Sequence, residues 1–203
     1  MQELMVDFIT SLDGYAGAEG WPGWWGLQGP EYLAWLEEES EHDYTFLMGA
    51  NTYRLMYGFT TQSEAPQSEL TADEDAATAG LTNASKVVFS STLQGPLPWA
   101  NTELVSGDAV EAVAAMKRDG TSPMSTLGSV SLCRSLLEAG LVDRFRVVVF
   151  PVVTGSTGSD RIYDGYPDVA LEMTASRTFD GSIQLLEYVP TVLTGPPGAQ
   201  SAS

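Results

Sequence analysis

The sequence predicts one α/β domain with a mostly parallel central sheet that ends in an antiparallel hairpin. Short apolar runs rich in β-branched residues alternate with helical stretches, an order that is typical of parallel sheets covered by helices. Residues 145–153 are almost continuously apolar, as expected of a strand that is covered on both faces. Asp180-Gly181 separates two strand-like runs near the end of the chain and is a strong hairpin signal.

Local periodicity and turn residues give the order of the elements. Gly29-Pro30 indicates the start of the first helix, because proline is favoured at the first helical position. The acidic run at 37–41 is expected to form the solvated face of that helix. Asp108 is a suitable N-cap for a later helix, and Gly140 is a suitable stop for the next one. Strands are expected at 5–12, 45–48, 86–89, 103–105, 124–127, 145–153, 169–179 and 182–189, and helices at 31–43, 51–57, 109–118 and 129–139.

Two stretches lack this periodicity and are expected to be connections. Residues 15–30 are rich in Gly and Trp, and residues 60–84 are polar and acidic. A chain of 203 residues with 43% apolar residues can bury one sizeable core. We therefore expect one domain over residues 1–190 and a flexible tail over 191–203.

Composition limits the function classes. The chain carries 27 acidic and 9 basic residues, a formal net charge of −18, which repels phosphodiester backbones and anionic lipid surfaces. One cysteine, Cys133, and one histidine, His42, leave no intramolecular disulfide, zinc cluster or histidine-based triad. No apolar run is long enough for a membrane span, and the N-terminal residues do not have the pattern of a leader. We expect a cytoplasmic enzyme or binding protein for a small molecule, with no nucleic acid, membrane or metal partner.

Ligands of open α/β sheets bind at the carboxyl ends of the strands, so the residues after each expected strand are informative. Four such junctions supply Gly, Ser or Thr: residues 11–14, 49–52, 90–92 and 128–131. Gly128-Ser129, between a strand and a helix, would expose unpaired backbone N–H groups to an anion such as a pyrophosphate. Helix capping alone also favours these residue types, so a single junction has two interpretations.

Longer motifs extend this pattern over most of the chain. They are FITSLDG at 8–14, LMGANTYRLM at 47–56, VVFSSTL at 87–93, NTELVSGD at 101–108, STLGSVSLCRSLLEAGLVDRFRVVVFPVVTG at 125–155 and TFDGSIQLLEY at 178–188. In this order they resemble the dihydrofolate-reductase-like superfamily, and within it the branch related to the reductase domain of bacterial riboflavin biosynthesis. The block over 128–155 is the most specific part of the resemblance.

The resemblance implies a central sheet with NADPH lying across its strand ends. By motif position, Ile9 and Ala16 would flank the nicotinamide. Asp13 would face the substrate pocket as a proton donor, or would only fix its own turn. The adenosine side would be formed by Gly49, Ala50, Asn51, Thr52, Ser90, Ser91 and Thr92, and the pyrophosphate side by Gly128, Ser129, Val130, Ser131 and Leu132.

The sequence departs from this family at two positions that bear on cofactor choice. Members commonly carry Arg after the glycine of the second motif, and many carry another Arg in the third, where this chain has Ala50 and Ser91. A guanidinium gives a phosphate bidentate, charge-assisted bonds that Ala and Ser cannot give. We therefore expect little discrimination between NADPH and NADH, unless Arg54 substitutes for the missing cations rather than remaining a surface residue.

The remaining side chains leave alternatives open. Trp21, Trp24 and Trp25 either line the pocket of a flat substrate or pin their Gly-rich loop to the core. His42 is expected to be solvated, and Cys133 to pack in the core. The sequence favours an NAD(P)H-dependent reductase for a small conjugated heterocycle or carbonyl compound; the alternative is a non-catalytic small-molecule-binding protein with a degenerate cofactor site. Related reductases are generally dimeric, and the closing hairpin needs cover, so we also expect a homodimer.

Overall fold

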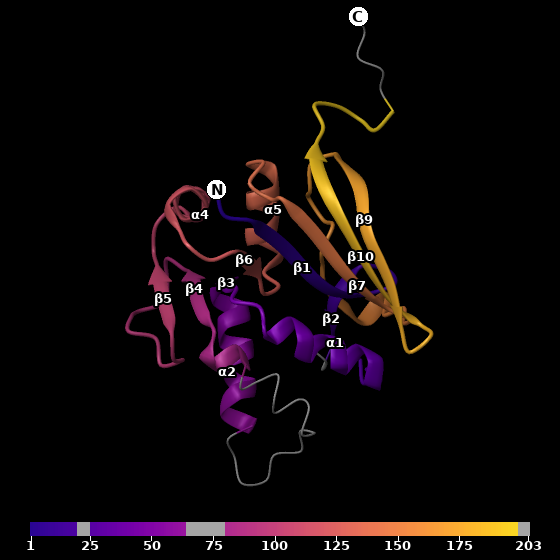
Figure 1. The fold of residues 1–203 in the computed structure, drawn as a ribbon, viewed down its shortest axis with the longest axis horizontal. Helices are drawn as coiled ribbons and strands as arrows, with labels where there is room; N and C mark the ends of the chain where they lie inside the picture. Colours follow the sequence, from indigo (N-terminus) through magenta and orange to yellow (C-terminus); the bar gives the residue numbers. More distant parts are fainter. Residues whose placement is uncertain (20–24, 64–79, 199–203) are drawn as a thin grey trace, which may run out of the picture.

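The computed structural model describes residues 1–19, 25–63 and 80–198. They form an eight-stranded sheet with helices on both faces, and a separate two-stranded sheet (Figure 1). The strands are β1 (Leu4–Ser11), β2 (Tyr15–Ala18), β3 (Thr45–Gly49), β4 (Ser85–Phe89), β5 (Thr102–Val105), β6 (Met124–Thr126), β7 (Arg144–Phe150), β8 (Gly158–Arg161), β9 (Val169–Phe179) and β10 (Ile183–Val192). The helices are α1 (Pro30–Ser40), α2 (Ala50–Ser63), α4 (Ala109–Asp119) and α5 (Val130–Glu138), with the one-turn 3-10 helix η1 (Gly155–Thr157).

The larger sheet is mostly parallel, as the sequence predicts. Its strands run in the order β5-β4-β3-β6-β1-β7-β10-β9. Every pair from β5 to β7 is parallel, and β10 pairs antiparallel with both β7 and β9. The hairpin turns through residues 180–182, because Phe179 pairs with Ile183. Asp180 and Gly181 have positive φ angles of 50° and 72°, and the N–H of Ser182 donates to the Phe179 carbonyl at 3.0 Å. The expected fold class is confirmed.

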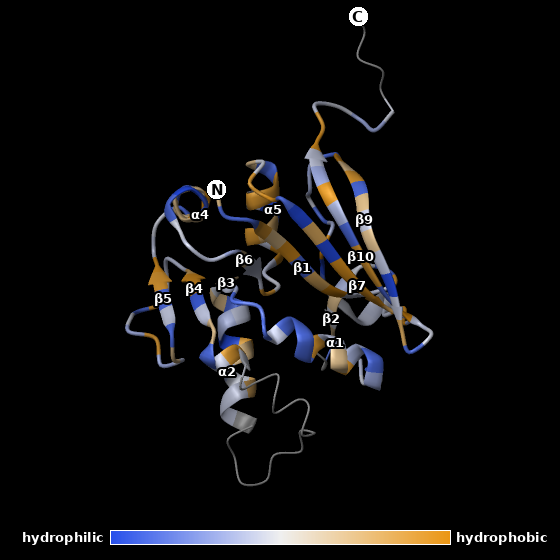
Figure 2. Cartoon of the chain, in the orientation of Figure 1, coloured by the Kyte–Doolittle hydropathy of each residue, from blue (hydrophilic) through white to orange (hydrophobic). Residues whose placement is uncertain are grey.

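Two layers of helices bury this sheet. Alternate residues of a strand point to opposite faces, so Val147 and Val148 of β7 report on different layers. Val147 belongs to the cluster that holds α4 and α5, whereas Val148 packs with Tyr32 of α1. Tyr53 of α2 packs on the strands β3 and β4 from the α1 side. Figure 2 shows the apolar residues along the central strands β1 and β7, where the two layers meet the sheet.

The segment expected to be a loop after β1 begins with a strand. Tyr15–Ala18 pairs antiparallel with Gly158–Arg161 in the smaller sheet. Both strands have only four residues, and each finds its partner far along the chain, so no local pattern marks them. A Cβ on Gly158 would lie 2.6 Å from the ring of Tyr15. Glycine at this position therefore allows the two strands to approach.

Several elements end at residues other than those expected from the sequence. α2 continues to Ser63, beyond the expected end at 57, and α1 ends at Ser40 instead of 43. β10 extends to Val192 because it stays paired with β9 as far as Val169. The strand thus continues two residues past the domain boundary expected at 190.

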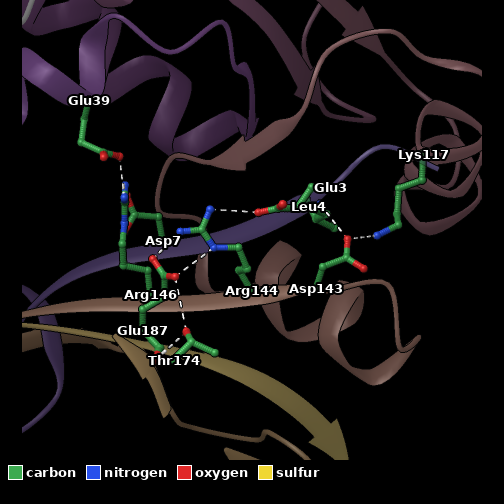
Figure 3. Close-up of polar contacts among 10 residues, drawn as sticks. All are labelled: Glu3, Leu4, Asp7, Glu39, Lys117, Asp143, Arg144, Arg146, Thr174 and Glu187. Carbon is green, nitrogen blue, oxygen red and sulfur yellow. Dashed lines mark hydrogen bonds and ion pairs between the residues drawn. The ribbon is translucent and has the colours of Figure 1, made fainter. Parts of the chain in front are cut away.

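The acidic face of α1 is not wholly solvated, contrary to the sequence expectation. Glu39 forms an ion pair with Arg146 of β7, and only 7% of the Arg146 side chain is exposed. Asp7 of β1 accepts two further bonds from the same guanidinium, at 3.0 and 2.8 Å, as Figure 3 shows. Beside it, Arg144 pairs with Glu187 of β10 and with Glu3, just before β1. This network of ion pairs joins α1 to the sheet through the buried guanidinium of Arg146. Removing one partner of a buried ion pair lowers the free energy of unfolding by about 3–5 kcal/mol, because the other charge is left buried and unpaired.

Candidate active site

The four polar junctions lie at one edge of the sheet. They follow β1, β3, β4 and β6, and these strands are consecutive in the sheet order β4-β3-β6-β1. All of them are parallel, so their carboxyl ends meet at the same edge. The topology therefore brings together residues 11–14, 49–52, 90–92 and 128–131, which the sequence analysis had to treat as separate segments.

The Gly128-Ser129 turn after β6 has an unusual backbone. Both residues have positive φ angles, 59° and 69°, and for a serine this conformation costs about 1–2 kcal/mol. Ser129 is the N-cap of α5, yet its side chain makes no capping bond to the helix. The first N–H groups of an α-helix have no partner within the helix. The N–H groups of Val130, Ser131 and Leu132, which the resemblance assigns to the pyrophosphate side, therefore receive no cap from the Ser129 side chain.

The side chain of Ser129 is directed to the neighbouring strand instead. Its Oγ accepts a hydrogen bond from the N–H of Gly49 at 2.8 Å and lies 2.7 Å from Oγ1 of Thr52. Gly49 ends β3, and α2 begins at the next residue, Ala50. The Ser129 bonds thus join the N-termini of α2 and α5 into one structure. Sequence reasoning placed Thr52 and Ser129 near the cofactor but did not foresee this bond, for which neither segment carries a local signal.

The remaining polar residues of the 49–52 and 90–92 junctions are exposed or partly exposed. Asn51 is exposed, and its side-chain oxygen accepts a bond from Arg54 at 3.2 Å. Ser90 closes a local turn, because its Oγ accepts bonds from the N–H groups of Thr92 and Leu93, both at 3.1 Å. Ser91 is exposed at the tip of this turn. These contacts leave the end of β4 polar and open.

Asp13 occupies a position that suits turn formation better than proton donation. Its carboxylate accepts bonds from the hydroxyl of Ser11 at 2.7 Å and from the N–H groups of Thr154 and Gly155 at 3.2 and 2.9 Å. The Ser11 bond, followed by the backbone bonds, lowers the pKa of Asp13 to about 2. A group that is ionised at neutral pH has no proton to give. The structure therefore favours the turn-fixing alternative, and it adds Thr154 and Gly155 to the site.

The residues expected beside the nicotinamide lie on the two sides of β1. Ile9 is partly buried and packs against the core cluster that contains α1, and Ala16 packs against the core cluster that contains α5.

Trp25 contacts the ring of Phe150 at a centroid distance of 5.7 Å, and its indole Nε1 is buried and without a hydrogen-bond partner. Trp25 therefore pins its loop to the core. Trp21 and Trp24 lie outside the described residues.

The contacts of the basic side chains limit how an anion could be bound at the carboxyl edge of the sheet. All nine basic residues of the chain lie in the described ranges. Arg54 and Arg134 lie in α2 and α5, the helices that follow two of the junctions, and Arg54 contacts Asn51. Arg134 lies against Gly165, and the remaining seven bond or face carboxylates or carbonyl groups: Lys86, Lys117, Arg118, Arg144, Arg146, Arg161 and Arg177. An anion at this edge must therefore be bound mainly by backbone N–H groups.

A polar groove of about 480 Å³ lies at the opposite edge of the sheet, where β3, β4 and β5 begin. Its lysine, Lys86, donates to the carbonyl oxygens of residues 81, 82 and 84 and so has no free donor for a ligand in this groove.

Within the described ranges no three His, Cys, Asp or Glu residues are arranged to hold a metal ion. In the same part of the chain no helix has the length and apolar character needed to cross a bilayer. The carboxyl edge, where the four polar junctions meet, is the candidate site.

The chain matches the family model of the RibD C-terminal domain over residues 2–185. It belongs to the RibD C-terminal domain family. A related sequence is the uncharacterized protein YyaP of Bacillus subtilis, which is 24% identical over 187 residues, covering 92% of this chain and 94% of YyaP. The resemblance on which the sequence analysis relied is confirmed.

Solved structures show the same fold. A putative riboflavin biosynthesis protein from Shewanella superposes with a TM-score of 0.68 and 18% identity, over 94% of this chain and 99% of that one. Dihydrofolate reductase from Enterococcus faecalis, complexed with NADP(H), gives 0.61 and 13%, over 93% and 96%. A bifunctional deaminase/5-amino-6-(5-phosphoribosylamino)uracil reductase from Thermotoga maritima gives 0.61 and 14%, over 94% of this chain but 57% of that protein. The RibD C-terminal domain of this chain thus has a reductase-like fold.

Proposed function

We propose that this RibD C-terminal domain is an NAD(P)H-dependent reductase that transfers hydride to a small conjugated heterocycle or carbonyl compound. The observation that carries the proposal is the Gly128-Ser129 turn, which leaves the N-terminus of α5 uncapped at the carboxyl edge of the sheet. A diphosphate is an anion of the size that such a backbone site accommodates. The donors fit this group even though the chain has a net charge of −18, because helix N–H groups act locally.

Each part of the edge has a role in this proposal. The α5 N-terminus holds the diphosphate, and residues 49–52 and 90–92 hold the adenosine half. Ile9 and Ala16, at the end of β1 and in β2, orient the nicotinamide. When bound, the cofactor supplies the hydride, and the protein supplies position and excludes water.

We expect the protein to discriminate little between NADPH and NADH. The residues at positions 50 and 91, Ala and Ser, cannot form a bidentate bond to a 2′-phosphate. Arg54 is bonded to Asn51 and is a surface residue of α2. NADPH is the cofactor that the structural relatives suggest, because one of them was solved with NADP(H). NADH should bind with similar affinity.

The proposed substrate is planar and carries little negative charge. Folate is disfavoured, because its acidic tail needs a basic clamp, and seven of the nine basic residues bond or face carboxylates or carbonyl groups elsewhere in the chain. A pyrimidine ring is one conjugated heterocycle of suitable size, and the Thermotoga relative is described as a uracil-derivative reductase. The alternative function, a non-catalytic binding protein, is favoured by Ala50 and Ser91.

Titration with NADPH and NADH, followed by tryptophan fluorescence, tests the proposal. Trp25 lies in the loop that follows β2, so binding at the edge should change the emission with a saturable dependence on concentration. The reductase proposal requires that at least one cofactor binds. If neither changes the emission nor is retained in equilibrium dialysis, the non-catalytic alternative replaces it.

A further inference from the structure

Cys133 lies directly beneath the turn that presents the N-terminus of α5. Its side chain is fully buried, and its Sγ lies 3.1 Å from the carbonyl oxygen of Gly128. Burial raises the pKa of the Cys133 thiol to about 12, so the thiol keeps its proton at neutral pH and can donate it to this oxygen. Core packing, the role expected of Cys133 from the sequence, does not account for this bond.

The strand that leads into this turn is fixed in the sheet. The N–H of Asp7 in β1 donates to Oγ1 of Thr126 at 3.1 Å. Thr126 ends β6 and is almost fully buried. The turn that carries Gly128 therefore starts from a fixed point in the core.

The orientation of one peptide group follows from this bond. The C=O of Gly128 and the N–H of Ser129 belong to the same planar, trans peptide, so they point in opposite directions. When Cys133 holds the carbonyl toward the core, the N–H of Ser129 points away from the core. This N–H then lies beside the uncapped N–H groups of α5, and Ser129 has the positive φ of 69° that the arrangement needs.

We propose that Cys133 is a positioning residue for anion binding at this turn, because its thiol holds the Gly128 carbonyl inward and thereby directs the Ser129 N–H to the phosphate groups of the ligand. The inference rests on the proposed function, since the ligand is the diphosphate of a nicotinamide cofactor. Cys133 touches neither the cofactor nor the substrate. It acts only through the backbone of Gly128 and Ser129.

Three variants test this role by NADPH titration. Cys133→Ala removes the donor and should raise the dissociation constant of NADPH about three- to ten-fold, because the cofactor loses a directed N–H. Cys133→Ser keeps a donor at the same position and should stay within about two-fold of the wild-type value. Leu136→Ala is the matched control: it removes a fully buried side chain from the same helix without touching the turn, and the NADPH affinity should be unchanged. Unfolding in urea shows that each variant is folded.

Two results would overturn the proposal: equal NADPH affinity for wild type and Cys133→Ala, or equal losses for the Ala and Ser variants. The chain has one cysteine, so the infrared S–H stretching band of the wild-type protein reports on Cys133 alone. This measurement needs no variant and therefore tests the bond even if the variants do not fold. The band should lie at the lower frequency of a hydrogen-bonded thiol and shift when NADPH is added. A band at the frequency of a free thiol contradicts the proposal. Failure of the wild type to bind NADPH or NADH would instead refute the proposed function, while the band position without cofactor would still test the bond to Gly128.

Discussion

Gly128 is the residue at which, in the proposed site, a positive φ angle coincides with the approach of the ligand. Gly128→Val places a branched side chain at a φ of 59° beside the uncapped end of α5, and it should weaken NADPH binding at least about ten-fold by blocking a charge-assisted bond. Gly140→Val is the matched control, because Gly140 has a φ of 66° at the other end of the same helix and has open space around its Cβ position. Fluorescence titration of both folded variants makes the comparison. Equal affinity in the two variants would remove Gly128 from the site.

In the proposed site, position 50 is expected to decide how strongly a 2′-phosphate is recognised. Ala50→Arg adds a guanidinium at the first residue of α2, and we expect NADPH affinity to rise by about 1.5–3 kcal/mol more than NADH affinity. Ala50→Gln has a similar length without the charge and serves as the control. The two cofactors are titrated in parallel against each variant. A similar gain for NADPH and NADH would show that position 50 does not face the 2′-phosphate.

At the scale of elements, α1 is capped by a residue from the hairpin between β9 and β10. The carboxylate of Asp180 accepts bonds from the N–H groups of Glu31 and Tyr32 at 3.0 and 3.1 Å, and the Glu31 carboxylate accepts a bond from the Asp180 N–H at 2.6 Å. A Cβ on Gly29, the N-cap residue, would lie 2.2 Å from the Asp180 carboxyl carbon. Gly29 therefore leaves room for a reciprocal cap supplied from a distant part of the chain.

Asp180→Gly should lower the free energy of unfolding by about 1–2 kcal/mol, because it removes this cap without straining a residue that has positive φ. Asp160→Gly is the matched control: Asp160 has a φ of 56° but caps no helix. The control should be close to the wild type in urea unfolding. If both variants lose the same stability, the cap contributes nothing.

These elements also show which features the sequence could predict. The alternation of strand and helix, the Asp180-Gly181 hairpin and the Asp108 cap depend on residues within a few positions of one another, and the structure confirms them. The α1 cap joins positions 149 apart, and the Glu39–Arg146 pair joins positions 107 apart. Neither the cap nor the pair has a local signature.

The candidate site was predictable to a similar extent. The strand ends could be located because glycine and hydroxyl side chains mark them. The Ser129 bond to Gly49 and the Cys133 bond to Gly128 could not, because they depend on the order of β3 and β6 in the sheet and on the backbone angles of one turn.

At the scale of the whole molecule, β9 is an unpaired edge of the larger sheet. Nearly all of its residues are exposed, among them Leu171 and Met173, and Val189 of the adjacent β10 is also exposed. An exposed edge of eleven residues with apolar side chains is a ready surface for strand pairing. A net charge of −18 opposes nonspecific association, so we propose that a second copy of the chain covers this edge.

Light scattering should therefore give about twice the chain mass at micromolar concentration, and the dimer should persist in high salt, which screens the repulsion between two acidic subunits. Met173→Lys should shift the protein to monomers, whereas Leu55→Lys, at an exposed leucine of α2, should not. A wild-type protein that stays monomeric at all accessible concentrations would contradict the dimer and leave the reductase proposal intact.

The central claim is that the N-terminus of α5 binds the diphosphate of a nicotinamide cofactor. A crystal structure of the protein grown with NADPH tests it most directly. The account predicts phosphate oxygens about 2.7–3.2 Å from the backbone nitrogens of Ser129, Val130 or Ser131, with the nicotinamide near the end of β1. NADPH bound in the groove at the start of β3, β4 and β5, or with its diphosphate away from α5, would contradict the account.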